Sequence, residues 1–342
     1  MRRATGFCLP RREKGSNMQL KFYAAAFLFL GAFCLQGRGA MALCLGLRLQ
    51  NVPATLTYQG SSGEYAVYDP AEYMQTVNFQ VISPITLVTC DYFITLSAGG
   101  SGNASQRVLT RGGDMLNYNA YTTAAKTAVI KPLGSAGAGE VITGLFPALI
   151  GIGQTQNKSF YWSITPQQVV RADTLRFQDT PVTMTLYAGL LLGLYQQVDT
   201  RTITFQARAE SSVDLSLVDS GGAFSVADTA QTVDFGNLSA GQLRSYDTMV
   251  RTNDGYRITL QSQNGQKLQH LTAPAQTVPY TISIGGVAVD LSSGAAVQAL
   301  SANTVTPAAG ARLQTDVTIG AMSGIEMPGT YRDVITVTVS AQ

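Results

Sequence analysis

The sequence predicts an all-β protein made of two tandem immunoglobulin-like β-sandwiches. Apolar and polar residues alternate with a period of two in many short runs, which is typical of half-buried strands. Clusters of Gly, Asn, Asp and Ser separate these runs, and no long stretch after the N-terminal leader has a helical period with caps. Many short strands between turn signals favour a sandwich.

Residues 1–42 are predicted to be a leader with a secretory signal. Lys21 supplies the positive start, and residues 22–35 form an apolar run that is shorter than the roughly 20 residues needed to cross a bilayer. Residues 40–42 give the small-x-small cleavage pattern. The mature chain is therefore expected to begin at Leu43 and to be exported.

Charge and composition exclude several classes of protein. Charged residues make up 13% of the 342 residues, about half of the usual share. A disordered chain and a nucleic-acid-binding protein both need more charge, so neither is expected. Removal of the leader takes away seven of the 23 basic residues and one of the 21 acidic residues, which leaves a formal charge of −4.

Two cysteines, Cys44 and Cys90, remain after removal of the leader. In an oxidising compartment an even pair favours a disulfide, and two free thiols are the alternative. The bond would close a long loop and contribute about 4 kcal/mol to stability.

The expected strands divide the mature chain into two domains. The clearest alternating runs are residues 203–207, 213–217, 256–260, 280–284 and 335–340. A loose repeat relates residues 177–186 to residues 331–339. Each copy has an aromatic-x-Asp sequence followed by a strand with alternating Thr, although the first copy has one extra residue. The prediction is a first domain over residues 43–200 and a second over residues 201–342, with residues 188–202 joining them.

Catalytic constellations are mostly missing. The nucleophile-elbow, phosphate-loop and dinucleotide-binding motifs do not occur. The one histidine, His270, is expected to have a surface or structural role. We therefore predict no catalytic residue, no metal site and no cofactor, although scattered carboxylates leave a glycoside-hydrolase pair as a remote alternative.

The run from residue 141 to residue 153 is rich in bulky apolar residues but contains Pro147 and three glycines, which is unfavourable in a central strand. An exposed loop here would form an apolar contact surface, and a kinked core strand is the alternative. The candidate surface-binding residues are Leu145, Phe146, Leu149, Ile150 and Ile152. A second apolar run, residues 190–195, is expected to be buried between the domains.

Several motifs resemble the spore coat U family, which includes subunits of archaic chaperone–usher pili. In the first domain they are Cys44, residues 68–70, 88–100 and 115–121, and in the second they are residues 233–236, 253–256 and 329–333. The second domain departs from the family because it has no cysteine. The first departs at Ile130, where Ile-Lys-Pro replaces a frequent Trp-Gly.

The resemblance implies immunoglobulin-like domains that are completed by a strand from another protein. The donors would be a periplasmic pilus chaperone and then the adjacent pilin subunit, delivered through an outer-membrane usher. Main-chain hydrogen bonds would hold the added strand. The expected acceptor edge carries Tyr331, Ile335, Val337 and Val339, since the sequence stops soon after this strand.

No donor segment is expected, because the mature chain reaches Cys44 at its second residue. A subunit that accepts a strand and donates none resembles a pilus tip adhesin, exported through the periplasm to the cell surface. Its apolar loops would attach to hydrophobic or host surfaces and support biofilm formation. The alternatives are a non-fibrous secreted coat protein and a secreted sugar-binding or carbohydrate-active β-sandwich.

Overall fold

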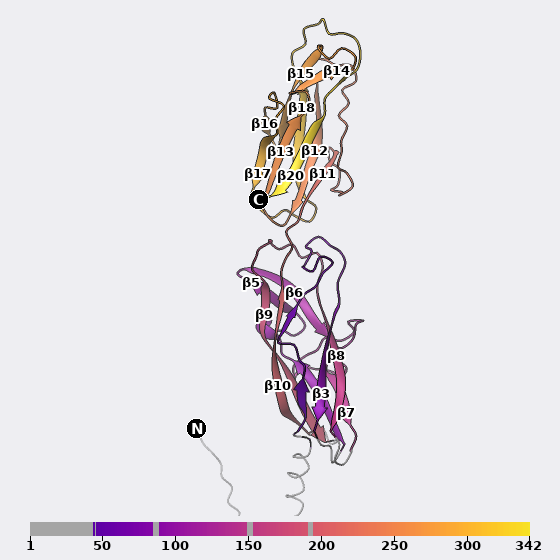
Figure 1. Cartoon of the computed structure of the whole chain (residues 1–342), viewed down its shortest axis with the longest axis vertical. Coiled ribbons are helices and arrows are strands. Elements are labelled where there is room, and N and C mark those ends of the chain that lie inside the picture. The colour runs from indigo at the N-terminus through magenta and orange to yellow at the C-terminus, as the bar shows by residue number, and fades with distance from the viewer. Residues whose placement is uncertain (1–43, 45, 85–88, 149–152, 191–193) are drawn as a thin grey trace, which may run out of the picture.

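The computed structural model describes residues 44, 46–84, 89–148, 153–190 and 194–342. Strands dominate the described chain, and the one named helix is the short 3-10 turn η2 (Gly99–Ser101). Two stacks of strands follow each other along the long axis of the molecule (Figure 1). The all-β class predicted from the sequence is confirmed.

The first stack is one hydrogen-bonded sheet that folds over its own core. Its strands run in the order β1-β3-β8-β6-β5-β9-β10-β2, and β4 pairs with β7 and β9. The strands are β1 (Arg48–Gln50), β2 (Thr55–Thr57), β3 (Gln75–Ser83), β4 (Cys90–Leu96), β5 (Arg107–Arg111), β6 (Asp114–Tyr121), β7 (Ile142–Phe146), β8 (Gln154–Ile164), β9 (Phe177–Leu190) and β10 (Leu194–Ala207).

The second stack consists of two sheets. The larger has the order β11-β12-β18-β15-β14-β19, with β16 beside β15, and the smaller has the order β17-β13-β20. The strands are β11 (Val213–Asp219), β12 (Leu243–Thr252), β13 (Tyr256–Ser262), β14 (Lys267–His270), β15 (Thr277–Ile284), β16 (Val287–Val289), β17 (Val297–Ala302), β18 (Ala311–Ile319), β19 (Tyr331–Arg332) and β20 (Ile335–Ala341).

Two separate hydrophobic cores define two sandwiches. The first core contains buried residues from Cys44 to Ala209, and the second contains buried residues from Leu217 to Ile319. Trp162 is fully buried in the first core and meets the rings of Tyr58, Tyr118 and Phe205 edge-on. Such edge-to-face contacts stabilise the fold beyond the effect of the apolar area that the rings bury.

The structure corrects the predicted boundary between the domains. Strand β10 runs through residues 200 and 201 and pairs with β9 along its length. Residues 188–202, expected to join the domains, are largely part of this β9–β10 hairpin. The change from one core to the other falls between Ala209, which is buried in the first core, and Val213, where β11 begins.

The loose sequence repeat corresponds to the same contact in both sandwiches. Tyr118 donates its hydroxyl hydrogen to Asp179 at 2.7 Å, and Tyr280 donates to Asp333 at 2.6 Å. Burial raises the pKa of both tyrosines, so both keep the proton that they donate. Asp179 lies near the start of β9, and Asp333 lies just before β20.

The two sandwiches meet at Asn253, in the turn between β12 and β13. Its side chain donates to Glu210 O at 2.7 Å and accepts from Ser212 N–H at 2.8 Å, so it binds the linker main chain. Its own carbonyl accepts from Ala172 N–H of the first sandwich at 2.9 Å. The fully buried Asn253 therefore joins the linker, the first sandwich and the second sandwich.

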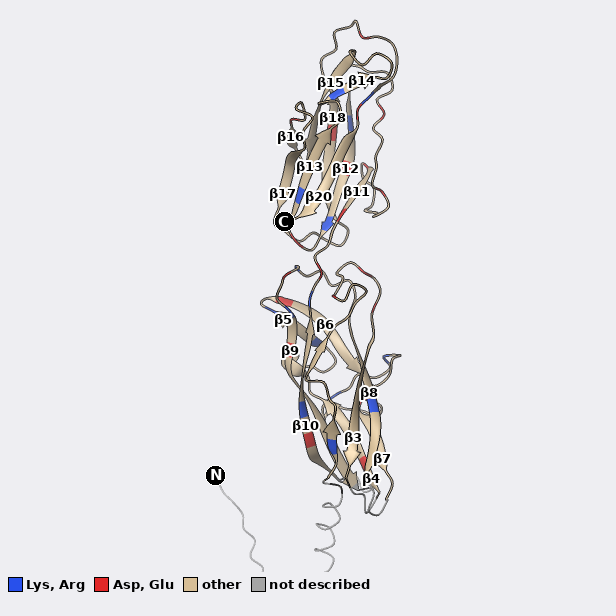
Figure 2. Cartoon of the chain, viewed as in Figure 1, with Lys and Arg blue, Asp and Glu red and all other residues tan. Residues whose placement is uncertain are grey.

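Charged residues are scattered singly over both sandwiches, without a run of either sign (Figure 2). No helix among the described residues is long and apolar enough to span a membrane.

Candidate functional site

The candidate acceptor strand, β20, is paired along one side. It pairs antiparallel with β13, and no other described strand pairs with it. Gln263 N–H donates to Val334 O at 2.9 Å and Gln342 N–H donates to Gly255 O at 3.0 Å. Main-chain hydrogen bonds alternate along an antiparallel pair, so the even-numbered residues of β20 face β13. The main-chain groups of Ile335, Val337 and Val339 point to the open side.

The apolar side chains of β20 are only half-buried. Val337 and Val339 lie opposite Leu260 and Ile258, which are 1% and 0% exposed. Ile335, Val337 and Val339 pack against the second core but keep part of their surface in solvent. The second core is therefore incomplete along β20.

The equivalent strand of the first sandwich, β9, provides an internal comparison. It begins with the first copy of the aromatic-x-Asp sequence, whereas β20 follows the second copy. Strand β9 is flanked by β4 on one side and by β10 on the other, and Val182, Met184 and Leu186 are fully buried. An added neighbour on the open side of β20 would give it the same environment.

The open side of β20 faces β11, which it contacts without pairing (Figure 1). Val213 and Leu215 of β11 are also half-buried against the second core. Tyr331, expected on the acceptor edge, instead belongs to β19 and pairs with His270 of β14. Of the predicted edge residues, the structure brings Ile335, Val337 and Val339 together.

The second candidate site is the end of the first sandwich that lies far from the second. Strands β4, β7 and β9 meet there, since Cys90 pairs with Phe146 and Asp91 pairs with Gly189 (Figure 2). We call this end the apolar pole, because the sequence that connects its strands is Ile-Thr-Leu-Val at 85–88, Leu-Ile-Gly-Ile at 149–152 and Leu-Leu-Gly at 191–193. All three connections lie outside the described residues.

The structure separates the predicted surface-binding residues. Phe146 is fully buried and stacks on Tyr92 with the ring centroids 5.4 Å apart, so its prediction as an exposed contact residue is wrong. It is the alternate residue on β7 that faces the core. Its neighbour Leu145 faces outward and is 48% exposed. Leu149, Ile150 and Ile152 lie outside the described residues.

The second apolar run also belongs to the pole. Tyr195 of β10 donates its hydroxyl hydrogen to Asp91 at 2.8 Å and is 43% exposed. For Tyr195 the expected burial between the domains is therefore wrong, because β9 ends and β10 begins at the opposite end of the first sandwich. Residues 191–193 lie outside the described residues.

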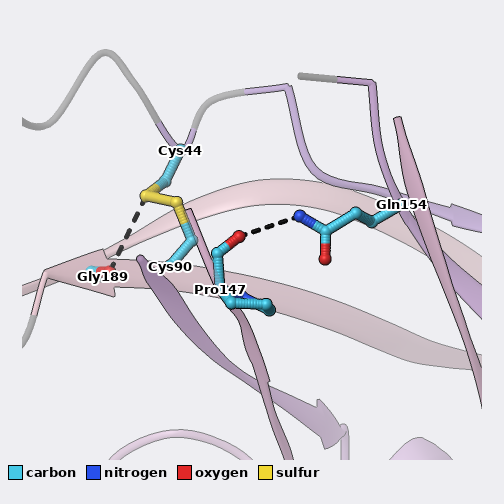
Figure 3. Close-up of a disulfide and its surroundings, with 5 residues drawn as sticks. All are labelled: Cys44, Cys90, Pro147, Gln154 and Gly189. Carbon is cyan, nitrogen blue, oxygen red and sulfur yellow. Dashed lines mark hydrogen bonds between the residues drawn. A yellow bond between two sulfur atoms is a disulfide. The ribbon is translucent and has the colours of Figure 1, made fainter. Parts of the chain in front are cut away.

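A disulfide joins Cys44 to Cys90 at the apolar pole, which confirms the predicted pair (Figure 3). Both residues are buried. Cys44 Sγ lies 3.9 Å from the carbonyl oxygen of Gly189. The bond fixes the start of the described chain to the first residue of β4.

A row of polar side chains on β8 lies near the same pole and was not predicted. Gln154, Gln156 and Lys158 alternate along the strand with the exposed residues Thr155 and Asn157. The signal that could have found them is the alternation of the buried residues later in the same strand, which places the row on the core-facing side.

The described residues contain no group of His, Cys, Asp and Glu side chains placed to hold a metal ion. His270 is 4% exposed, and its ring accepts from Ala273 N–H at 3.0 Å and meets Tyr331 edge-on. His270 is the last residue of β14 and packs against Tyr331 of β19, which is a structural role.

In a comparison with known families, residues 55–185 match the Spore Coat Protein U domain. The search of curated proteins gives no match. The sequence motifs and the family comparison agree on the first domain.

Among solved structures, the chain is similar to the CsuC–CsuE chaperone–tip adhesion subunit complex of archaic Csu pili of Acinetobacter baumannii. That alignment has 14% identity and a TM-score of 0.41 and covers 84% of this chain and 99% of that one. The alignment with the CupB6 tip adhesin of Pseudomonas aeruginosa has 8% identity and a TM-score of 0.35. It covers 87% of this chain and 94% of that one. The alignment with CfaE, the adhesive subunit of CFA/I fimbria of enterotoxigenic Escherichia coli, has 12% identity and a TM-score of 0.34. It covers 87% of this chain and 82% of that one.

These matches are to a coat-protein domain and to pilus adhesins, not to enzymes. The resemblance predicted from the sequence motifs is thus confirmed over residues 55–185, which match the Spore Coat Protein U domain.

Proposed function

We propose that the protein is the tip adhesin subunit of a chaperone–usher pilus, with a first domain over residues 44–209 that attaches and a second that accepts a strand. The observation that carries the proposal is the open edge of β20, where main-chain groups have no neighbouring strand among the described residues and three apolar side chains remain half-buried. An edge of this kind is a template for another chain.

The donated strand would lie between β20 and β11, antiparallel to β20. Antiparallel pairing is the commoner kind, and β20 already pairs with β13 in this way. Main-chain bonds to Ile335, Val337 and Val339 would supply affinity, and the half-buried core would supply pockets for alternate side chains. A periplasmic chaperone and then an adjacent pilin subunit, with the outer-membrane usher, are the proposed partners.

Capture by the chaperone tests strand acceptance. We expect the full chain, produced in the periplasm with a tagged cognate chaperone, to be retained on the tag. A chain that carries an alternating apolar strand fused after Gln342 through a short turn should be released, because the fused strand fills the open edge of β20.

The matched control carries the same fusion with Ser in place of each inward-facing apolar residue, and it should still be retained. Equal retention of the wild-type chain and the apolar fusion would contradict strand acceptance. A stable wild-type chain that never binds the chaperone would favour a free-standing coat protein.

Attachment is proposed to occur at the apolar pole, through Leu145 and the apolar connections 85–88, 149–152 and 191–193. Large apolar patches on a protein surface usually mark contact sites. Burial of such groups contributes about 25 cal/mol per Å², and many fibres acting together add avidity. On this proposal the cells would use the pilus to colonise surfaces and to form biofilm.

The triple change Leu145→Ser, Leu149→Ser and Ile150→Ser is expected to abolish retention of the chain on a methyl-terminated surface while the melting temperature stays unchanged. Phe146 is left intact, because emptying its buried site would cost about 3–5 kcal/mol of stability.

The control for attachment is Leu175→Ser, which removes an equally apolar side chain that is 63% exposed near the opposite end of β9. Unchanged retention of the triple variant would place attachment elsewhere on the chain.

A further inference from the structure

Three polar side chains lie on the core-facing side of β8. Cross-strand pairing sets Lys158 opposite Phe79 and Gln156 opposite Val81, and both partners on β3 are almost fully buried. Later in β8 the same side carries apolar residues that are fully buried. A strand would ordinarily keep apolar residues on this side, so the polar row needs a structural reason.

The reason is a set of hydrogen bonds to β7 and to Pro147, which directly follows it. Gln154 Nε2 donates to Pro147 O at 2.8 Å (Figure 3). Gln156 Nε2 donates to Leu145 O at 2.7 Å. Lys158 Nζ donates to Thr143 O at 2.8 Å. We call these three side chains the β8 ladder.

The ladder replaces a main-chain pairing. Strands β7 and β8 follow each other in the chain, but β7 pairs only with β4 among the described strands. Thr143 and Leu145 are alternate residues of β7, so their main-chain groups face the same way, and their carbonyls accept from the ladder rather than from β4. Without the ladder, β7 would present an unpaired edge.

Neighbouring groups hold the ladder in place. Tyr92 of β4 donates its hydroxyl hydrogen to Gln156 Oε1 at 2.6 Å, which fixes both ends of that amide. The ammonium of Lys158 lies 5.5 Å from the centre of the Tyr92 ring. Burial lowers the pKa of Lys158 from its usual value, in keeping with its place in the rim of the sandwich.

We propose that Gln154, Gln156 and Lys158 close the outer edge of β7 to strand addition, so that β20 stays open to a partner strand while β7 does not. The sequence of β7, Ile-Thr-Gly-Leu-Phe, has no charge and no proline to discourage pairing. Its protection therefore comes from outside the strand, through donors that occupy the carbonyls an incoming strand would need. The ladder would protect β7 in this way whether or not the protein ends a pilus.

The test removes the donors and keeps the length of the side chains. In the full mature chain with Gln154→Met, Gln156→Met and Lys158→Met, we expect the amide hydrogens of Gly144 and Phe146 to exchange about a hundredfold faster, since each lost hydrogen bond contributes about a factor of five. Sedimentation velocity should show more self-association than in the parent chain, because β7 can then pair with a second copy.

Two further variants separate edge opening from other causes. Thr155→Met adds a methionine on the opposite, exposed face of the same strand and should change neither measurement. Adding Thr143→Lys to the triple variant places a charge on the opened edge and should reverse the self-association. Lys158→Met alone keeps the Gln156–Tyr92 bond and should give about a fivefold faster exchange, which covers the case in which the triple variant does not fold.

The proposal would be overturned if the triple variant and Lys158→Met both kept the amide exchange rates and the self-association of the parent chain. So would self-association that Thr143→Lys leaves unchanged, since it would then arise from the added apolar surface. Chaperone capture through β20 is measured separately, so its failure would reject the proposed function without affecting this result.

Discussion

Fusion of an alternating apolar strand after Gln342 is expected to raise the melting temperature of the second sandwich by at least about 10 °C. The added strand would bury three or more of its own apolar side chains and cover Ile335, Val337 and Val339, which are now half-buried. Full burial of one such side chain contributes about 1.5–3 kcal/mol. Self-association through the open edge should fall at the same time.

The geometry sets the design of the fusion. Strand β20 ends beside the turn between β12 and β13, since Gln342 N–H donates to Gly255 O at 3.0 Å. A strand antiparallel to β20 begins at that point, so a two-residue Asn-Gly hairpin turn is sufficient. Differential scanning calorimetry should show the shift in the transition of the second sandwich alone.

The same fusion with Ser at the inward-facing positions should give little shift, because it restores main-chain bonds without filling the core. A wild-type chain that is monomeric and melts at the same temperature as the apolar fusion would mean that the second sandwich is already complete. The tip-adhesin proposal would then give way to a coat protein.

Replacement of Cys44 and Cys90 by Ala is expected to lower the free energy of unfolding of the first sandwich by about 4 kcal/mol. The two cysteines are 46 residues apart in sequence, and the cross-link restricts that loop in the unfolded chain. The loss should be visible in urea unfolding as a lower midpoint of the first-sandwich transition.

The second sandwich contains no cysteine, so its transition is the internal control and should not move. Reduction of the wild-type disulfide should reproduce the effect of the substitutions. Equal shifts of both transitions would mean that the sandwiches unfold as one unit, and no shift would mean that β4 is held at the pole without the bond.

Local patterns predicted the strands well. The alternating runs around Val213, Tyr256, Tyr280 and Ile335 are strands β11, β13, β15 and β20. The loose repeat also had a physical basis, since both of its aspartates accept a tyrosine hydroxyl. The two-residue period and the short motifs were sufficient to predict a strand where one of its faces is apolar and the other is polar.

Pairing between distant strands was not predictable in the same way. The apolar content of residues 145–152 was visible, but that Phe146 is buried depends on its pairing with Cys90 and on the ring of Tyr92. Polar residues occupy both faces at the start of β8, so the inward direction of Gln154 and Gln156 follows only from the buried residues later in the same strand. The domain boundary was misplaced because the apolar run at residues 190–195 was interpreted as a connection buried between the domains. Strands β9 and β10 on either side of it instead pair with each other in the first sandwich.

The joint at Asn253 determines how mechanical tension would pass through the molecule. A pull on the first sandwich reaches the linker, and Asn253 ties that linker to the turn between β12 and β13 at Glu210 and Ser212. The load would therefore enter the second sandwich at the ends of β11, β12 and β13 and act along the strands. Hydrogen bonds between antiparallel strands lie perpendicular to that direction. They would carry the load together in shear rather than open one at a time.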